Sequence, residues 1–246
     1  MEIPVNVEIN PKWFTKKIVL WYRLVHWCCA RWAKKIFTVS DFSKQELVKV
    51  YNIPEQKIIN IGDGWRHIKH VQSDNDVVEK FGLIKKNFYY SLGTKPPHTN
   101  MNLVFDNAQN HPEKTFAISG SANNKIFGRV LNQLPSNVRF LGYLSDPEIK
   151  ALMENCEAFI FPSFYEGFGI PPLEALSLGC PVVVSNISVM REIFDESVHY
   201  IDPNSTDVDL DVLLREPVSL AAPILEKYNW EKSAKKILDN IKIVGK

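Results

Sequence analysis

The chain alternates between short runs of β-branched and aromatic residues and longer stretches in which apolar residues recur at helical spacing. After a first helix, this pattern predicts strands at 36–39 and 58–61, with a helix over 41–51 between them. A second alternating series predicts six further strands, at Phe88–Leu92, Thr115–Ser119, Val138–Leu141, Ala158–Phe161, Pro181–Val184 and His199–Ile201. Strands that alternate with helices are typical of parallel βαβ units. The sequence therefore predicts an α/β protein with Rossmann-like parallel sheets and helices on both faces.

A polar stretch between the two series marks the expected domain boundary, near 64–76. We assign residues 1–70 to an incomplete N-terminal domain and residues 71–228 to a larger C-terminal domain. Residues 229–246 form a closing helix that crosses back toward the N-terminal part. Its apolar residues share one face, which predicts core packing.

The segment Pro11–Lys35 is the most basic and aromatic part of the chain and is predicted to be an amphipathic helix. It carries four tryptophans, at positions 13, 21, 27 and 32, interleaved with lysines and arginines. Such a helix can lie on an anionic membrane surface, but an interdomain helix of a large α/β protein has the same composition. We favour the interdomain helix, and keep a membrane surface or a protein partner at Trp13–Lys35 as the alternative.

Composition removes several classes of protein. A hydrophobic fraction of 45% and a charged fraction of 23% are those of an ordinary globular protein, and 29 basic residues nearly balance 28 acidic ones, so no overall field favours nucleic acid. The four cysteines lack metal-ligand spacing, which fits a reducing cytoplasm. No apolar run approaches the ~18 residues that a membrane span requires, so we expect a cytoplasmic protein.

Loops that follow the predicted strands are where a ligand is expected, because ligands of open parallel sheets bind beyond the carboxyl ends of the strands. One such loop contains Gly93, Thr94, Lys95 and Thr99 and opens a helix, whose free amides suit an anion. A second, around Gly120, is small and polar and carries a weaker signal.

The loop Pro162–Leu176 is the most informative. Glu166 and Glu174 bracket a glycine-rich turn that runs into a helix with two prolines at its start. Amides at such a helix start can hold a diphosphate, and carboxylates can accept hydroxyls of a sugar. Each of these residues alone also fits a purely structural role: Glu174 could simply complement a helix dipole, and the glycines could simply serve a tight turn.

The stretch Glu166-Gly-Phe-Gly-Ile-Pro-Pro-Leu-Glu174-Ala resembles the Glu-x7-Glu motif of the retaining family-4 glycosyltransferases. This GT-B family has two Rossmann-like domains and includes bacterial mannosyl-, rhamnosyl- and glucosyltransferases. Further segments are similar in the same order, and together they cover most of the chain from about Pro11: Phe37–Ser43, Asn60–Gly64, Phe140–Tyr143 with Ser145 and Asp146, and Tyr228–Trp230. The resemblance implies a GT-B fold with an incomplete N-terminal domain.

The resemblance also implies roles for single residues. Glu166 would be the catalytic position, against the donor sugar, and the backbone around Phe168, Gly169 and Ile170 would contact the sugar and the diphosphate. Glu174 would accept the ribose hydroxyls. The implied donor is a nucleoside diphosphate sugar, with GDP-mannose favoured by likeness to O-antigen mannosyltransferases, and no metal or other cofactor is implied.

Two departures from the family pattern bear on activity. Thr99 stands where the family usually carries a basic residue for the diphosphate, and Lys95 in the same loop is the candidate substitute. The chain also carries only the last part of the N-terminal domain, which supplies most of the acceptor site in the family.

We therefore expect retaining transfer of a hexose to a polysaccharide or lipopolysaccharide acceptor. The alternative is a truncated or noncatalytic nucleotide-sugar-binding subunit that needs a second polypeptide. A dinucleotide-binding redox domain is disfavoured, because no Gly-x-Gly-x-x-Gly follows the first strand.

Overall fold

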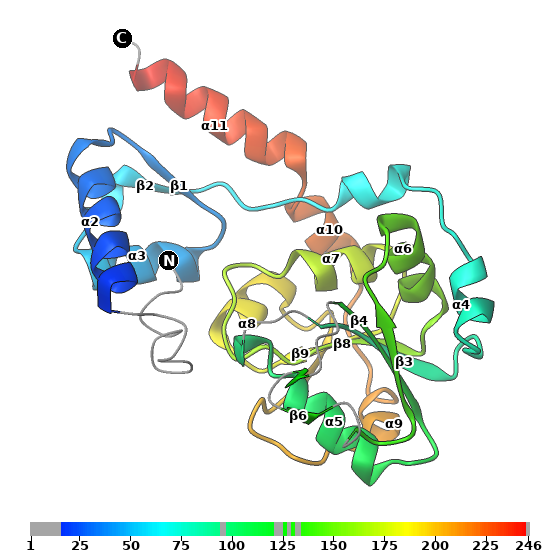
Figure 1. The fold of residues 1–246 in the computed structure, drawn as a ribbon. Helices are drawn as coiled ribbons and strands as arrows, with labels where there is room; N and C mark the ends of the chain where they lie inside the picture. Colours follow the sequence, from blue (N-terminus) through cyan, green and yellow to red (C-terminus); the bar gives the residue numbers. More distant parts are fainter. Residues whose placement is uncertain (1–15, 94–96, 121–124, 127–128, 131–133, 245–246) are drawn as a thin grey trace.

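The computed structural model describes residues 16–93, 97–120, 125–126, 129–130 and 134–244. Figure 1 shows a small N-terminal unit beside a larger α/β unit, with the last helix running between them. The N-terminal unit consists of α2 (Lys16–Trp32), β1 (Ile36–Thr38), α3 (Asp41–Tyr51), the 3-10 helix η1 (Glu55–Lys57) and β2 (Ile58–Asn60). β1 and β2 pair in parallel, with Ile36 opposite Ile58. The predicted strand–helix–strand order is confirmed here.

The first helix is shorter than predicted at its C-terminal end. It ends at Trp32 instead of Lys35, because the chain must turn before β1 begins at Ile36. The Nζ atom of Lys57 donates to the carbonyl oxygen of Ala30 in the last turn at 3.0 Å, which satisfies one of the acceptors that a helix end leaves open. Residues 11–15 of the predicted helix lie outside the described residues.

Six parallel strands form the sheet of the larger unit, in the order β10-β9-β8-β3-β4-β7. Their bounds are β3 Phe88–Gly93, β4 Thr115–Gly120, β7 Val138–Gly142, β8 Ala158–Phe161, β9 Val182–Ser185 and β10 His199–Ile201. Every strand predicted for this unit is confirmed to within one residue at each end. A short antiparallel pair between β4 and β7, β5 (Lys125–Ile126) with β6 (Arg129–Val130), was not predicted.

Helices cover both faces of this sheet, and alternation along β3 explains how. Phe88 and Tyr90 pack in one buried cluster with residues of α6 (Asp146–Asn155), α7 (Ile170–Ser177) and α8 (Ser188–Phe194). Tyr89 points the other way and packs with residues of α5 (Met101–Asn110). Neighbouring side chains of a strand point to opposite faces, so a strand that is apolar throughout is covered on both sides.

The remaining elements of the larger unit are short. They are the 3-10 helices η2 (Arg66–His70) and η3 (Pro97–Thr99) and the helices α4 (Asp76–Lys80), α9 (Leu210–Leu213) and α10 (Ala222–Lys227). At the start of α6, the backbone N–H and the hydroxyl of Ser145 both donate to Glu148 Oε2 at 2.9 Å. A serine followed three residues later by a glutamate is the sequence pattern of a capping box, which predicts a helix start at Ser145, and these bonds confirm it.

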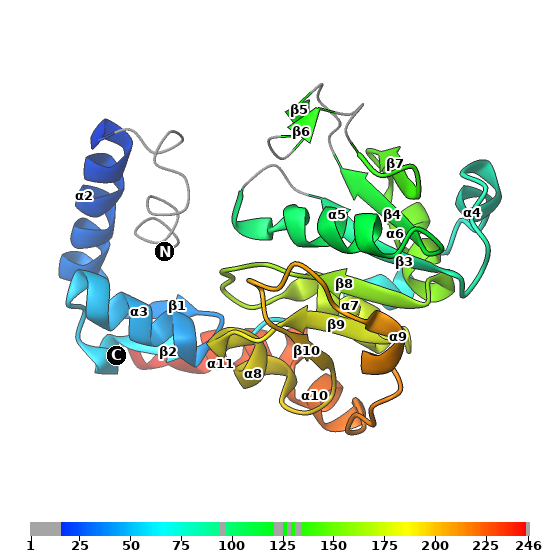
Figure 2. The ribbon, with the colours of Figure 1, turned by 90° about the horizontal axis from the view of Figure 1, so that it is seen from below.

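The last helix, α11 (Trp230–Val244), runs back from the larger unit along the N-terminal unit (Figures 1 and 2). The Ser233 hydroxyl donates to the carbonyl oxygen of Ile61 at 3.1 Å, and Lys236 Nζ donates to that of Asn60 at 3.1 Å. These bonds join α11 to the end of the N-terminal unit, but the predicted core stripe is wrong. Leu238 and Ile241 are each 55% exposed, because no element in the described part of the chain covers that face of α11.

Candidate active site

The order of the strands indicates where a ligand would bind at the carboxyl edge of the sheet. β3 lies in the middle, the chain adds β4 and β7 on one side of it, and it then returns to add β8, β9 and β10 on the other. The order therefore reverses between β3 and β8, the kind of position where open parallel sheets bind ligands. The predicted loops that begin at Gly93 and around Glu166 follow these two strands.

Gly93 and Gly120 lie opposite each other at the ends of β3 and β4. The Gly120 backbone has φ +136°, and a Cβ at this position would lie 1.8 Å from the Gly93 carbonyl oxygen. Only glycine fits there. The loops after β3 and β8 are joined directly, because the backbone N–H of Phe164 donates to the carbonyl oxygen of His98 at 2.7 Å.

Two of the predicted residues in the first loop, Thr94 and Lys95, lie outside the described residues. Thr99 ends η3 and is only 6% exposed. The next residue, Asn100, has a left-handed backbone and donates from its side chain to the Pro203 carbonyl oxygen at 2.8 Å. The residue at the family's basic position is thus a buried threonine in a tight turn.

Aromatic side chains anchor the loop that carries Glu166. Tyr165 and Phe168 are 7% and 3% exposed and flank a half-buried Glu166. The Tyr165 ring contacts Phe42 of α3, with centroids 5.6 Å apart, and the Phe168 ring meets Tyr228 edge-on at 5.1 Å. The backbone on both sides of the glutamate is therefore held by buried rings.

The turn into α7 uses an unusual backbone conformation. Gly169 has φ +105° and precedes the helix, and a Cβ there would lie 3.1 Å from Met190 Cε. Both residues after Ile170 are prolines, which have no N–H. The N–H groups just before these prolines are those of Phe168, Gly169 and Ile170, the residues to which the resemblance assigns the diphosphate.

Glu174 lies in the second turn of α7, not the first, so a role that only complements the helix dipole is not supported. Its side chain is 14% exposed, and Oε1 accepts a hydrogen bond from Nε2 of His67. Burial raises the pKa of the Glu174 carboxyl group, and the hydrogen bond from His67 opposes that rise. The carboxylate is therefore partly desolvated and already oriented.

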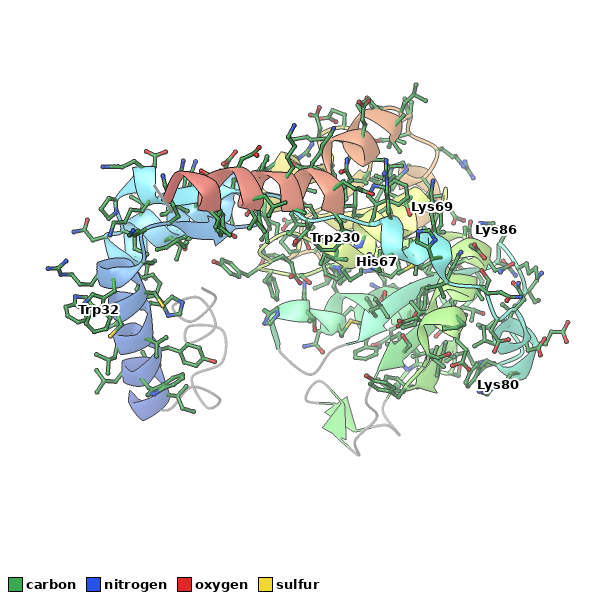
Figure 3. All side chains as sticks on the ribbon, turned by 90° about the horizontal axis from the view of Figure 1, so that it is seen from above. Trp32, His67, Lys69, Lys80, Lys86 and Trp230 are labelled. Atoms are coloured by element: carbon green, nitrogen blue, oxygen red, sulfur yellow. The ribbon has the colours of Figure 1, made fainter. Side chains whose placement is uncertain are left out.

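The His67 ring bridges two elements that are far apart in the chain. Trp230 Nε1 donates to His67 Nδ1 at 3.0 Å, and Figure 3 labels the two residues next to each other. Because an indole N–H can only donate, Nδ1 must be the acceptor and Nε2 must carry the ring proton. Sequence reasoning did not find His67. The only signals were the neighbouring segments Asn60–Gly64 and Tyr228–Trp230.

The N-terminal unit also reaches the Glu166 loop. The Ser40 hydroxyl donates to the Gly167 carbonyl oxygen at 2.7 Å, and the Ser43 hydroxyl donates to the same oxygen at 3.3 Å. The Glu192 carboxylate accepts from the backbone N–H groups of Asp41 and Phe42, both at 2.7 Å, at the start of α3. The segment that resembles the family at Phe37–Ser43 thus contacts the candidate site.

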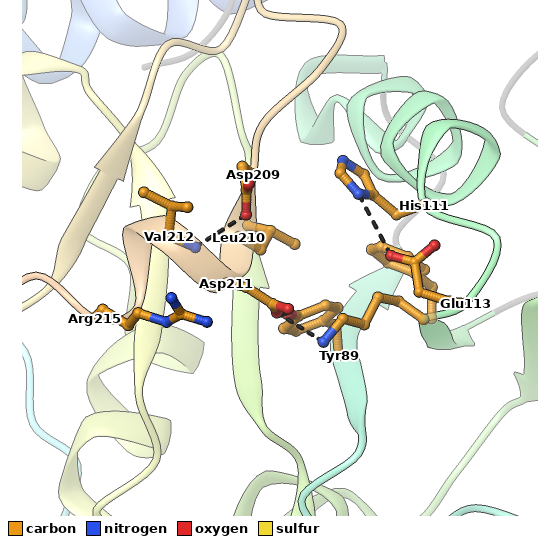
Figure 4. A pocket seen from close by; sticks show the side chains of 10 residues that line it. Tyr89, His111, Glu113, Asp209, Leu210, Asp211, Val212 and Arg215 are labelled. Atoms are coloured by element: carbon orange, nitrogen blue, oxygen red, sulfur yellow. Dashed lines mark hydrogen bonds and ion pairs between the residues drawn. The ribbon is translucent and has the colours of Figure 1, made fainter.

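A separate cavity of about 310 Å³ lies at the amino ends of β3 and β4, the opposite edge of the sheet (Figure 4). Asp211 accepts from the Tyr89 hydroxyl and from Lys114 Nζ, both at 2.7 Å, and these contacts lower the pKa of its carboxyl group. His111 pairs with Asp207 at 3.1 Å. The charged groups that line this cavity pair with one another and connect α9 to the sheet, so we assign them a structural role.

The described residues contain no cluster of three or more His, Cys, Asp or Glu side chains arranged to hold a metal ion. Among the helices that the structure describes, none has the length and apolar character needed to cross a bilayer.

The parallel sheet, the short β1–β2 pair and the crossing helix define a protein of the GT-B glycosyltransferase fold. A solved structure described as Anabaena Alr3699/HepE in complex with UDP and glucose has a TM-score of 0.73 and 18% identity, covering 95% of this chain and 69% of that one. A glycosyltransferase from Rickettsia africae has a TM-score of 0.68 and 20% identity, covering 87% and 64%.

Residues 75–211 match the family described as Glycosyl transferases group 1, and the chain belongs to that family. It is 32% identical over 187 residues to O-antigen chain mannosyltransferase B of Escherichia coli, covering 71% of this chain and 49% of that protein. It is 27% identical over 207 residues to O-antigen chain mannosyltransferase RfbU of Salmonella typhimurium, covering 80% and 55%. The chain thus spans about half the length of these relatives. The GT-B fold and the glycosyltransferase family expected from the sequence are confirmed, while the family-4 type and the retaining mechanism stay predictions.

Proposed function

We propose that the chain is the donor-binding half of a retaining mannosyltransferase of the family-4 type that acts in surface polysaccharide assembly. The observation that carries this proposal is the arrangement at the switch point. A largely buried and oriented carboxylate, Glu174, follows the helix start at Gly169, and the loops after β3 and β8 are joined by the hydrogen bond from Phe164 to His98. The names of the Escherichia coli and Salmonella relatives support mannose as the sugar.

In this proposal the donor is a nucleoside diphosphate sugar, with GDP-mannose favoured. Glu174 accepts the ribose hydroxyls, because an ionised carboxylate offers only acceptors and suits a vicinal diol. The amides of Phe168, Gly169 and Ile170 receive the diphosphate, whose negative charge grows as the bond to the sugar breaks. Lys95, in the loop after β3, supplies a cation for the same group.

Glu166 lies against the sugar in this arrangement and acts on the reacting centre. Transfer with retention puts the acceptor and the leaving group on the same face of the sugar. The leaving phosphate oxygen can then take the proton of the acceptor hydroxyl, so the proposal needs no separate protein base. The aromatic anchors on either side keep Glu166 in place while this charge develops.

A second observation favours the alternative, a donor-binding subunit that works with a second polypeptide. Leu20, Trp21 and Trp32 of α2 are 70%, 60% and 71% exposed (Figure 3 labels Trp32). Large apolar side chains that gather on an exposed surface normally mark an interaction site, and parallel strands are normally covered on both faces. We propose that further protein, in the same chain or another, covers α2 and β1 and brings most of the acceptor site.

Calorimetric titration tests the donor half directly. The purified chain is titrated with GDP, UDP, GDP-mannose and UDP-glucose, beside Glu174→Ala and, as a matched control, Glu79→Ala on the exposed face of α4. We expect selective binding of one nucleotide, weakened about tenfold or more in Glu174→Ala by loss of a charged acceptor, and unchanged in the control. Equal affinity of all three proteins for every nucleotide would refute the site.

A further inference from the structure

We propose that His67 is a positioning residue of the donor site, which holds the Glu174 carboxylate in the orientation that the ribose needs and is itself oriented by Trp230. The inference rests on the proposed role of Glu174 in binding the ribose. It adds two residues to a site otherwise built from the larger unit. One comes from the linker, residues 61–75 between β2 and α4, which includes η2, and the other comes from the last helix.

The backbone around His67 is anchored on both sides. Trp65 is 5% exposed and donates from Nε1 to the Leu225 carbonyl oxygen at 3.0 Å. Ile68 is 4% exposed and packs in the same buried cluster as Trp65. His67 lies between these anchors in η2, so its imidazole has a fixed starting point although 47% of the side chain is exposed.

Both ring nitrogens of His67 have partners, and the partners select one tautomer. The bond from Trp230 Nε1 occupies Nδ1, which leaves the single proton of the neutral ring on Nε2, directed at Glu174 Oε1. One carboxylate oxygen thus receives a donor from the protein. A carboxylate has about four acceptor positions, so the others remain for the two hydroxyls of a ribose.

Close backbone packing between the linker and α11 keeps His67 and Trp230 near each other. A Cβ on Gly64 would lie 2.5 Å from the backbone nitrogen of Trp230 and 2.8 Å from its Cγ. The linker therefore passes directly against the first residue of α11. The Ser233 hydroxyl, one turn along α11, lies 3.2 Å from the Gly62 carbonyl oxygen. These contacts hold the indole next to the imidazole.

The hydrogen bond has a consequence for the charge of Glu174. Burial favours the neutral acid, and the Nε2 proton of His67 favours the carboxylate. A protonated carboxyl group has fewer acceptor positions for a diol. The N–H that His67 donates therefore favours the ionised form of Glu174, which is the form that binds hydroxyls.

Binding of ribonucleotides and 2′-deoxynucleotides tests this inference. The full chain and the variants His67→Leu, His67→Gln, Trp230→Phe and Arg66→Gln are titrated with GDP and 2′-deoxy-GDP, or with UDP and 2′-deoxy-UDP if the chain prefers uridine. The Gln side chain keeps an N–H donor for Glu174. Arg66→Gln is the matched control, because Arg66 pairs with Glu231 at 3.0 Å between the same two segments.

We expect the full chain to prefer the ribonucleotide and His67→Leu to lose about tenfold in ribonucleotide affinity, with little change for the deoxynucleotide. His67→Gln should recover part of the preference, Trp230→Phe should lose part of it, and Arg66→Gln should keep it. An equal loss for both nucleotides would indicate a merely structural role and overturn the inference, as would tighter binding by His67→Leu, which would mean that His67 competes with the ribose.

A Glu174→Ala control separates this inference from the function on which it rests. If Glu174→Ala keeps the full preference for ribose, the proposed role of Glu174 fails, and the role of His67 fails with it. If Glu174→Ala loses the preference and His67→Leu keeps it, the donor site stands and only the positioning role is overturned.

Discussion

Ser40 joins the N-terminal unit to the loop of Glu166, and we expect its replacement by alanine to destabilise both. The side chain is fully buried. Its hydroxyl oxygen accepts from the backbone N–H of Ser43 at 3.0 Å, which caps α3, and donates to the Gly167 carbonyl oxygen at 2.7 Å. Because the side chain is buried, solvent water cannot replace these two bonds when the hydroxyl is removed.

The magnitude follows from the two bonds. Loss of a serine cap at a helix start costs about 1 kcal/mol, and loss of the buried hydrogen bond to Gly167 costs about 1 kcal/mol more. We therefore expect Ser40→Ala to lower the free energy of unfolding by about 2 kcal/mol. Ser43→Ala removes only the longer bond to the same oxygen, at 3.3 Å, and should cost about 0.5 kcal/mol.

Urea unfolding followed by circular dichroism measures both values, and amide hydrogen exchange over residues 165–169 locates the effect. Faster exchange in that loop is expected in Ser40→Ala, because Gly167 keeps only its weaker bond. If Ser40→Ala costs no more than Ser43→Ala, or if exchange rises only in α3, then the contact between the units does not stabilise the candidate site.

Two further predictions concern stability. Gly64→Ala should lower the free energy of unfolding by about 1–3 kcal/mol, because the added methyl group would lie 2.5 Å from the Trp230 backbone nitrogen. Thermal denaturation measures this loss. Gly167→Ala is the control, because its methyl group would meet nothing closer than 3.6 Å. Glu148 has a pKa lowered chiefly by the backbone hydrogen bond from Ser145, so its contribution is present above the pKa of the unfolded chain and is lost as the pH falls through the lower folded value. The melting temperature of Glu148→Gln should therefore lie below that of the unchanged chain at neutral pH and converge with it below about pH 4; a gap that is the same at every pH would show that the charge contributes nothing.

Much of the fold could be predicted because its signals are local. Apolar runs bounded by turn residues gave the strands, and the spacing of Ser145 and Glu148 gave a helix start. An amphipathic pattern shows that a helix has an apolar face but not what covers it, which is why the core packing predicted for α11 was wrong. The covering layer is a property of the whole fold.

The candidate site was predictable only in part, for a related reason. Glu166, Glu174 and the glycines between them lie in one short segment, so their order carries a recognisable pattern. His67 is 107 residues from Glu174 and 163 residues from Trp230 in the chain. Its tautomer and its contact depend on three segments that meet only in the folded protein, and no local spacing records that meeting.

The contact between α11 and the linker also constrains the order in which the protein can fold. Ser233 and Gly62 are 171 residues apart in sequence, and at 5–20 residues per second synthesis of the intervening chain takes roughly 10–30 s. Contacts between such distant segments form late, since a long loop must close before they stabilise anything. The parallel sheet can assemble on its own during that interval, but His67 acquires its tryptophan partner only when nearly all of the described chain has left the ribosome.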